Sequence, residues 1–268
     1  MKLDILICTY GKGVWRVPSV LLPVRQDVRY VVSYQYDDEF QQSDIPCSLF
    51  ERNDVEIYPI RGKGLAVNRN HALSQMKGDI ALFADDDVRY TNRQIDCIFD
   101  IFSAHKELDI ACFRAEGLDG SFLHHYAHES FSYEQRPYGT FFSSCEIVVR
   151  NRTDLPRFDV RFGLESPFLA CGEEEVFLHE SYLKGLVIRF FPITIVRTPS
   201  ATTGRRFACD KAVQRSKGAV LYVLHGFWGA MMRVVKYACC HVTEHRSSVL
   251  VQMVRGIWYM VCSTPQRK

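Results

Sequence analysis

The chain has 268 residues, of which 47% are hydrophobic and 24% charged, and a formal net charge of +2. This length predicts one core of about 200 residues with an additional element. The ten cysteines include no CxxC pair and no zinc-ligand spacing, and Asp4 interrupts the first apolar run, so we expect neither a cysteine-based zinc module nor an N-terminal signal peptide. We expect free thiols in a reducing cytoplasm.

Two strands are expected near the N-terminus. The first, Leu3–Gly11, is apolar and ends in a turn. The second, Arg29–Tyr36, is rich in Val and Tyr and ends at two acids, Asp37 and Asp38. Runs of this kind, bounded by turn residues, are typical of buried strands.

A helix and a third strand follow in the next part of the chain. Leu65–Lys77 has apolar residues at helical spacing, and Gly78 stands where a helix C-cap is expected. Ile80–Ala84 is a short continuous apolar run, which predicts a buried strand. Strands that alternate with helical stretches predict an α/β fold with a largely parallel sheet.

Three consecutive carboxylates, Asp85, Asp86 and Asp87, follow that strand. Adjacent acids repel one another unless a cation neutralises them. On extended chain Asp85 and Asp87 face the same way and could bind Mg²⁺ or Mn²⁺, while Asp86 points elsewhere. The carboxyl end of a strand is also where open α/β sheets bind ligands. A solvated acidic turn is the structural alternative for this cluster.

The order of these and later motifs resembles that of family-two inverting glycosyltransferases of the GT-A fold, of the type that builds bacterial glycans. The resemblance covers about residues 3 to 200. It implies an open, mostly parallel, twisted sheet flanked by helices. The motifs that carry it are Thr9-Tyr10 after the first strand, the acids after the second, Arg69-Asn70, Gly78–Asp87, Ser143–Arg150, Arg157–Phe162 and Gly172–Phe177.

The resemblance implies a site for a nucleotide-sugar donor, which we expect to be UDP-linked. Thr9 and Tyr10 would contact the base, and Asp38, rather than Asp37, would bond the uracil or ribose. Arg69 would approach the diphosphate or the sugar. For each of these residues, a plain loop or salt-bridge role is the alternative.

The acidic cluster is expected to serve the same donor. Asp87 and Asp85 would hold the metal ion, and Asp85 and Asp86 are counted among the donor-binding residues. A metal at the diphosphate stabilises the charge that grows on the leaving group as the glycosidic bond breaks.

A general base is expected in the acidic run Glu173, Glu174 and Glu175, which follows Gly172 and opens a helix. An inverting displacement needs one carboxylate to take the proton from the acceptor hydroxyl. In the resembled motif the second acid is the base, which maps to Glu174, with Glu173 as the neighbouring candidate. Acids at a helix N-terminus are also common without any catalytic role.

The C-terminal segment is strongly basic. From Arg205 onward there are 11 Lys and Arg against 2 Asp and Glu, or +9, so the first 204 residues carry −7. Two apolar stretches, Ala219–Val242 and Val249–Cys262, carry polar residues on one side, and neither is a clean transmembrane span. Basic amphipathic helices with aromatic residues suit an anionic membrane surface. A packed helical pair or a homodimer contact is the alternative.

The sequence thus predicts a GT-A domain at 1–204, with a nucleotide-binding half at 1–90 and an acceptor half at 91–204, and a basic helical tail at 205–268. The expected activity is metal-dependent, inverting transfer of a hexose from a nucleotide sugar to a glycan or lipid-linked acceptor. The expected location is the cytoplasm, at the inner face of the membrane, with no nucleic-acid partner. The alternatives are a non-catalytic sugar- or nucleotide-binding module and a metal-dependent phosphohydrolase.

Overall fold

The computed structural model describes residues 1–199, 203–240 and 246–263. The chain forms two compact units whose boundaries differ from the division expected at residue 204. The first unit contains residues 1–63, 67–157 and 180–201. The second contains 64–66, 158–179 and 202–268, so the basic C-terminal segment shares a unit with the loop that precedes the Glu173–Glu175 run.

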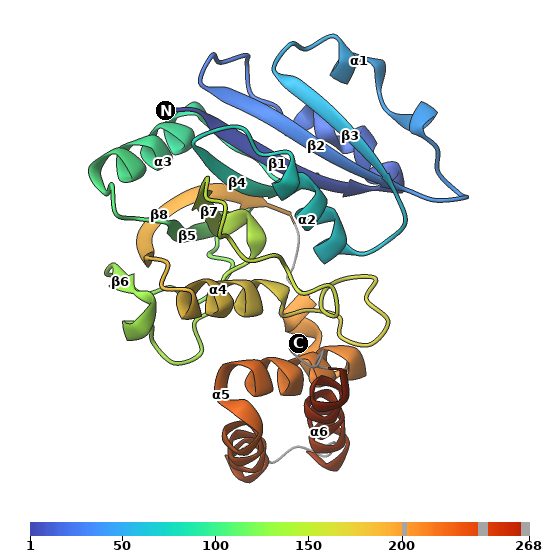
Figure 1. Cartoon of the computed structure of the whole chain (residues 1–268), viewed down its shortest axis with the longest axis vertical. Coiled ribbons are helices and arrows are strands. Elements are labelled where there is room, and N and C mark those ends of the chain that lie inside the picture. Colours follow the sequence, from blue (N-terminus) through green and yellow to red (C-terminus); the bar gives the residue numbers. More distant parts are fainter. Residues whose placement is uncertain (200–202, 241–245, 264–268) are drawn as a thin grey trace. The chain divides into compact units, whose positions relative to one another are not determined.

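An eight-stranded mixed sheet is the centre of the first unit (Figure 1). Its order is β3-β2-β1-β4-β7-β5-β8-β6. The pairs β1–β2, β2–β3, β1–β4 and β5–β8 are parallel, which confirms the predicted open α/β sheet. The strands are β1 Leu3–Tyr10, β2 Val28–Tyr36, β3 Val55–Arg61, β4 Ile80–Asp85, β5 Ile110–Gly117, β6 Phe131–Ser132, β7 Ile147–Arg150 and β8 Ile188–Thr198.

The strand order reverses between β1 and β4. From β1 the chain moves outward through β2 and β3, and it then returns to the other side of β1 to form β4. In the parallel pairing, Cys8 of β1 is opposite Asp85 of β4, so both strands end at the same edge. Such a reversal point leaves a crevice at the carboxyl ends of the strands, where open sheets bind ligands.

Helices α1 Cys47–Phe50, α2 Leu65–Ser74 and α3 Asn92–Ala104 connect these strands. Thr91 is the N-cap of α3: its side chain accepts a hydrogen bond from the backbone N–H of Gln94, and the Gln94 side chain accepts one from the backbone N–H of Thr91. This capping box satisfies N–H groups that have no partner within the helix. The buried face of α3, with Ile95, Ile98 and Phe102, packs into the main core.

The predicted C-cap at Gly78 is wrong. Helix α2 ends at Ser74, and Gly78 lies outside the positive-φ region that a C-cap glycine adopts. The Asp4 carboxylate accepts hydrogen bonds from the backbone N–H groups of Lys77 and Gly78, both at 2.7 Å. A Cβ at Gly78 would lie 2.9 Å from the Lys2 carbonyl oxygen, so close backbone approach explains this glycine.

Helices dominate the second unit: the start of α4 Glu173–Leu183, then α5 Lys211–Cys240 and α6 Arg246–Ser263. Helices α5 and α6 cross closely, because a Cβ on Gly218 or Gly256 would lie 1.9 Å from a carbonyl oxygen of the facing helix. The inward faces bury Ala230, Val234, Val249, Met253 and Ile257 together. The two apolar stretches therefore form a packed pair, which we call the helical hairpin.

Among the described residues, α5 is the one helix long and apolar enough to cross a membrane by length and composition (Lys211–Tyr237, mean hydropathy 1.3). At Gly226, however, φ is 66° and ψ is 179°, so the backbone is not helical there. This break divides α5 into two shorter helices. A transmembrane helix needs about 20 residues, and neither part is that long.

Glycines lie beyond both ends of α4, and they provide a matched pair of variants. Gly172 has φ of +101°, and a Cβ there would lie 2.5 Å from Val220 of α5. Gly185 has φ of +80° and no neighbour within 4 Å. We expect Gly172→Ala to lower the free energy of unfolding by about 3 kcal/mol, from strain plus overpacking, and Gly185→Ala by about 1 kcal/mol, from strain alone. Urea unfolding of both variants measures the difference, and equal effects would contradict the close α4–α5 packing.

Candidate active site

The carboxyl ends of β1 and β4 bring together side chains from distant parts of the first unit. Thr9 and Tyr10 end β1, and Asp85 ends β4, with Asp86 and Asp87 in the turn that follows. The three acids differ in exposure: the Asp85 side chain is 41% exposed and the Asp86 side chain 11%. Asp87 is half-buried.

Asp86 is held by the protein. The Thr9 hydroxyl donates a hydrogen bond of 2.6 Å to Asp86 Oδ2, and the Arg16 guanidinium pairs with Oδ1 through Nε and Nη2. Both carboxylate oxygens therefore have protein partners. The expected alternation does not extend over the cluster, because β4 ends at Asp85 and Asp86 and Asp87 lie in a turn. The contacts of Asp86 fix the turn that carries Asp85 and Asp87.

Arg69 of α2 lies beside Asp85. Its side chain is 4% exposed, its Nη2 lies 3.7 Å from Asp85 Oδ1, and it donates a 2.7 Å hydrogen bond to the Ser144 hydroxyl. The preceding residue, Asn68, donates to the Thr9 carbonyl oxygen at 3.0 Å. Helix α2 therefore fastens the ends of β1 and β4 to each other and places a buried positive charge next to the acidic cluster.

A thiol lies under the same edge. Burial is the main reason that the pKa of Cys8 is raised to about 12; the charge of Arg69 lowers this pKa, and those of Asp85 and Asp86 raise it. The thiol is therefore protonated at neutral pH. Since the thiolate is the nucleophilic form, a buried neutral thiol of this kind is typical of a structural cysteine.

Asp37, after β2, belongs to a second cluster at this edge. The Tyr10 hydroxyl donates to Asp37 Oδ2 at 2.7 Å, and Lys63 Nζ lies 3.0 Å from the same oxygen. Lys63 also lies 5.1 Å from the centre of the Tyr10 ring. The hydrogen bond from Tyr10 and the charge of Lys63 hold the pKa of Asp37 below its usual range. A carboxylate with these partners is ionised throughout the physiological range.

Asp38, the residue favoured for the nucleotide contact, has an open position. Its side chain is 92% exposed and pairs with Arg61 at the end of β3. The two acids after β2 thus differ: Asp37 orders Tyr10 and Lys63, whereas Asp38 is accessible. That arrangement leaves the assignment of Asp38 a prediction, with Asp37 in position to orient the Tyr10 ring.

The acidic cluster offers few ligands of its own. Within the described ranges, no group of three or more His, Cys, Asp or Glu side chains gathers around a common point. Mg²⁺ is commonly held by one or two carboxylates together with water and substrate phosphates. Asp85 and Asp87, partly exposed at the end of β4, fit that kind of site.

In the second unit, the three glutamates at the start of α4 have different environments. Glu173 is 3% exposed, and Glu175 Oε1 lies 3.7 Å from Lys217 Nζ of α5. Glu174 lies between them and is half-buried. The helix start favours negative charge on all three. Burial distinguishes Glu173 from Glu174 and Glu175, which are both half-buried, and the assignment of the base to Glu174 stays a prediction.

Sequence reasoning did not identify four residues that build this edge: Arg16, Lys63, Asn68 and Ser144. Arg16 and Asp86 are 70 residues apart, and Arg69 and Ser144 are 75 apart, so no local pattern connects them. The Lys63 contact depends on β3 lying next to β2. A signal was present for Asn68, which precedes Arg69 in the predicted helix, and for Ser144, which lies in the Ser143–Arg150 motif.

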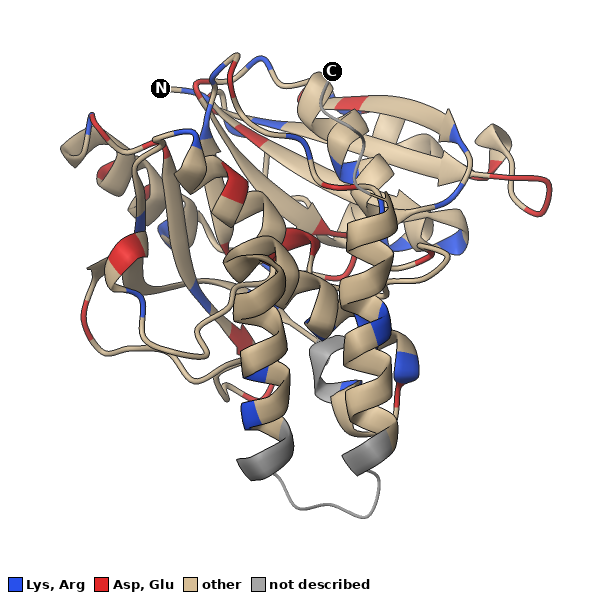
Figure 2. Ribbon diagram, turned by 60° about the horizontal axis from the view of Figure 1, so that its bottom comes forward, with Lys and Arg blue, Asp and Glu red and all other residues tan. Residues whose placement is uncertain are grey.

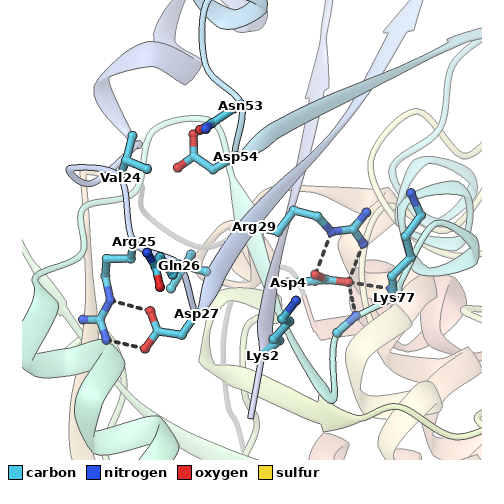
Figure 3. Close-up of a pocket in the computed structure, with 12 residues that line it drawn as sticks. Lys2, Asp4, Val24, Arg25, Gln26, Asp27, Arg29, Asn53, Asp54 and Lys77 are labelled. Atoms are coloured by element: carbon cyan, nitrogen blue, oxygen red, sulfur yellow. Dashed lines mark hydrogen bonds and ion pairs between the residues drawn. The ribbon is translucent and has the colours of Figure 1, made fainter.

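A cavity of about 450 Å³ lies at the opposite, amino-terminal edge of the sheet (Figure 3). Its charged residues are paired with one another: Arg29 with Asp4 at 2.6 Å, and Arg25 with Asp27 at 2.9 Å. Lys2 and Lys77 complete the basic part of its lining. Because each of these arginines is already paired with an aspartate, the pairs Arg29–Asp4 and Arg25–Asp27 have a structural role at this edge.

No protein-family model matches the sequence, and no curated protein matches it either. Solved structures of similar fold do exist. The chain is similar to S. aureus TarS 1-349 in complex with UDP-GlcNAc (TM-score 0.59, 15% identity, covering 96% of this chain and 82% of that one). It is also similar to S. aureus TarS 1-349 without a named ligand (17% identity) and to the complex of that fragment with UDP (16% identity). Both comparisons have a TM-score of 0.56 and cover 96% of this chain and 81% of the other. The chain therefore has the GT-A-like fold of glycosyltransferases.

Proposed function

We propose that this protein is an inverting glycosyltransferase that moves a hexose from a UDP-linked donor to a hydroxyl group of a glycan or lipid-linked acceptor. The observation that carries the proposal is the acidic cluster Asp85–Asp87 at the point where the strand order reverses between β1 and β4. In open sheets this is the place where nucleotides bind. The fold shared with S. aureus TarS, which was crystallised with UDP and with UDP-GlcNAc, supports a UDP-linked donor.

Each residue of the edge has a role in this proposal. Tyr10, oriented by Asp37 and Lys63, and the exposed Asp38 bind the nucleoside. Asp85 and Asp87 would hold a divalent cation, which would neutralise the leaving diphosphate. Asp86 keeps the turn in place through Thr9 and Arg16.

Arg69 stabilises the cluster in the absence of donor. Three adjacent carboxylates repel one another, and the guanidinium at 3.7 Å from Asp85 offsets part of that repulsion. It also supplies positive charge near the diphosphate, which favours binding of that group.

Glu174 is the proposed general base. It takes the proton of the acceptor hydroxyl as the oxygen attacks the anomeric carbon, and UDP leaves from the opposite face of the sugar. The assignment rests on the motif resemblance, in which the second acid is the base, and on the burial of Glu173.

The proposal is tested by thermal unfolding with UDP-, GDP- and dTDP-sugars, each with and without Mn²⁺. A donor that binds only the folded protein at about 100 times its Kd adds about 2.7 kcal/mol of stability. We expect UDP-sugars to raise the Tm by several degrees in the presence of Mn²⁺, and GDP- and dTDP-sugars to have little effect. No shift with any nucleotide sugar would contradict the proposal. Binding without UDP release in the presence of acceptor mixtures would favour the non-catalytic alternative.

A further inference from the structure

The helical hairpin has one apolar face without a protein partner among the described residues. On α5 the exposed members are Trp228, Met232 and Val235, which recur at i, i+4 and i+7. On α6 we take Trp258 and Val261, and Val251, seven residues before Trp258, is also exposed. Trp228 is 77% exposed and Trp258 is 53% exposed, which is unusual for such large side chains. We call these five residues the outer face.

An aromatic contact connects the outer faces of the two helices. The Phe227 ring lies 5.2 Å from the Trp228 ring and 5.9 Å from the Trp258 ring, measured between centroids. Phe227 follows Gly226, where the helix is broken. The three rings therefore form one cluster beside the break, with both indoles exposed.

The opposite faces of the same two helices are buried against each other. Ala230 and Val234 of α5 pack against Met253 and Ile257 of α6, and all four are at most 2% exposed. The outer face is therefore additional to the apolar surface that this unit needs in order to fold.

The charge of the hairpin has a single sign. Where their side chains are described, α5 and α6 include six Lys or Arg and no Asp or Glu, and Figure 2 shows blue but no red segments on these helices. Lys236 on α5 and Arg255 on α6 are exposed. Arg255 precedes Trp258 by three residues, so a basic group adjoins the apolar surface on that helix.

From this combination we infer that the outer face binds an anionic lipid surface, with Trp228 and Trp258 in the interface between headgroups and acyl chains. Indole rings favour that interface, and Lys and Arg beside them attract anionic headgroups. A helix with such a face lies in the plane of the membrane and does not span it. A second copy of this chain would present the same uncompensated positive charge, which disfavours pairing through this face.

The inference is independent of the proposed transferase activity. It is tested by co-sedimentation of the full chain with vesicles of phosphatidylcholine that contain about one-third phosphatidylglycerol. We expect sedimentation at about 0.05 M salt, loss at about 0.5 M salt, and none with pure phosphatidylcholine, because salt screens exposed charges.

Two double variants test the two kinds of contact. Trp228→Gln with Trp258→Gln should abolish sedimentation, whereas Tyr138→Ser, which removes a 99% exposed aromatic side chain of the first unit, should not. Lys236→Gln with Arg255→Gln should weaken partitioning roughly 30-fold, because each basic side chain near the surface contributes about fivefold. Arg93→Gln with Lys106→Gln removes two exposed charges from the first unit and should leave partitioning unchanged.

Unchanged melting temperatures for the variants show that any loss of binding is not caused by unfolding. Sedimentation that survives both hairpin double variants would overturn the inference, as would the absence of any sedimentation at low salt. A concentration-dependent dimer that the tryptophan variants dissociate, in protein that does not sediment, would identify a second copy as the occupant instead.

Discussion

Replacing Asp87 with Asn is expected to lower UDP release from the donor by about 10²-fold or more, because it removes a charged ligand from the diphosphate site. Asp85→Asn is expected to be less damaging, since Arg69 lies 3.7 Å from Asp85 and the variant also relieves part of the repulsion within the cluster. Both variants should remain folded, because the two side chains are partly exposed and the turn is held by Asp86.

The matched control is Asp100→Asn, which removes an exposed carboxylate from α3 in the same unit and should leave UDP release unchanged. Rates are compared at increasing Mn²⁺ concentration. Full activity in Asp87→Asn, or equal turnover of the wild type in the presence of a chelator, would show that the cluster holds no catalytic metal.

Replacing Glu174 with Gln is expected to lower turnover by about 10²-fold or more, because general base catalysis commonly contributes that much. Donor affinity should change little, since the base acts on the acceptor hydroxyl. The two effects are separated by measuring turnover at saturating donor, which reports the chemical step, and the donor-induced shift in Tm, which reports donor affinity.

The neighbouring glutamates serve as internal controls. Glu175→Gln loses only an ion pair with Lys217 at 3.7 Å and should retain most of the activity. Glu173 is buried, so Glu173→Gln is expected to affect the Tm more than turnover. If Glu173→Gln or Glu175→Gln abolishes turnover while Glu174→Gln does not, the base has been assigned to the wrong residue. If none of the three matters, the inverting mechanism as proposed is wrong.

The parts of the fold that the sequence revealed are those with strong local patterns. Continuous apolar runs predicted β1, β2 and β4 to within one residue at either end, because these central strands are buried on both faces. The edge strand β3 has no such run: its residues are half-buried or exposed, and its pattern does not stand out. Strand β5 was also not predicted, although five of its residues are buried.

Helix ends and long-range contacts were harder to predict. The sequence predicted Gly78 as a helix C-cap. In the structure, a glycine is required there because the Lys2 backbone and the Asp4 side chain approach too closely for a Cβ atom. The partners of Asp86 come from the end of β1 and from the segment that follows it, 77 and 70 residues away, and only the folded sheet brings them together. The acids themselves could be identified from the sequence, but not the network that orients them.

In the C-terminal segment, too, the local pattern could be predicted and the long-range contacts could not. Periodicity indicated two amphipathic helices, and α5 and α6 confirm them. It did not reveal that Val220 of α5 packs against Gly172 before α4, nor that Gly226 breaks the longer helix. A deletion at residue 205 would therefore remove packing from the helix that bears Glu174, and point variants of the outer face are the cleaner test of lipid binding.

The most direct test of the central claim is amide hydrogen exchange of the full chain with and without the UDP-sugar and Mn²⁺. The proposed site predicts increased protection in residues 9–16, 36–40 and 83–89, at the carboxyl ends of β1, β2 and β4. Protection confined to the other edge of the sheet, around the cavity lined by Lys2, Arg25 and Arg29, would contradict the account and move the donor site to the amino-terminal edge.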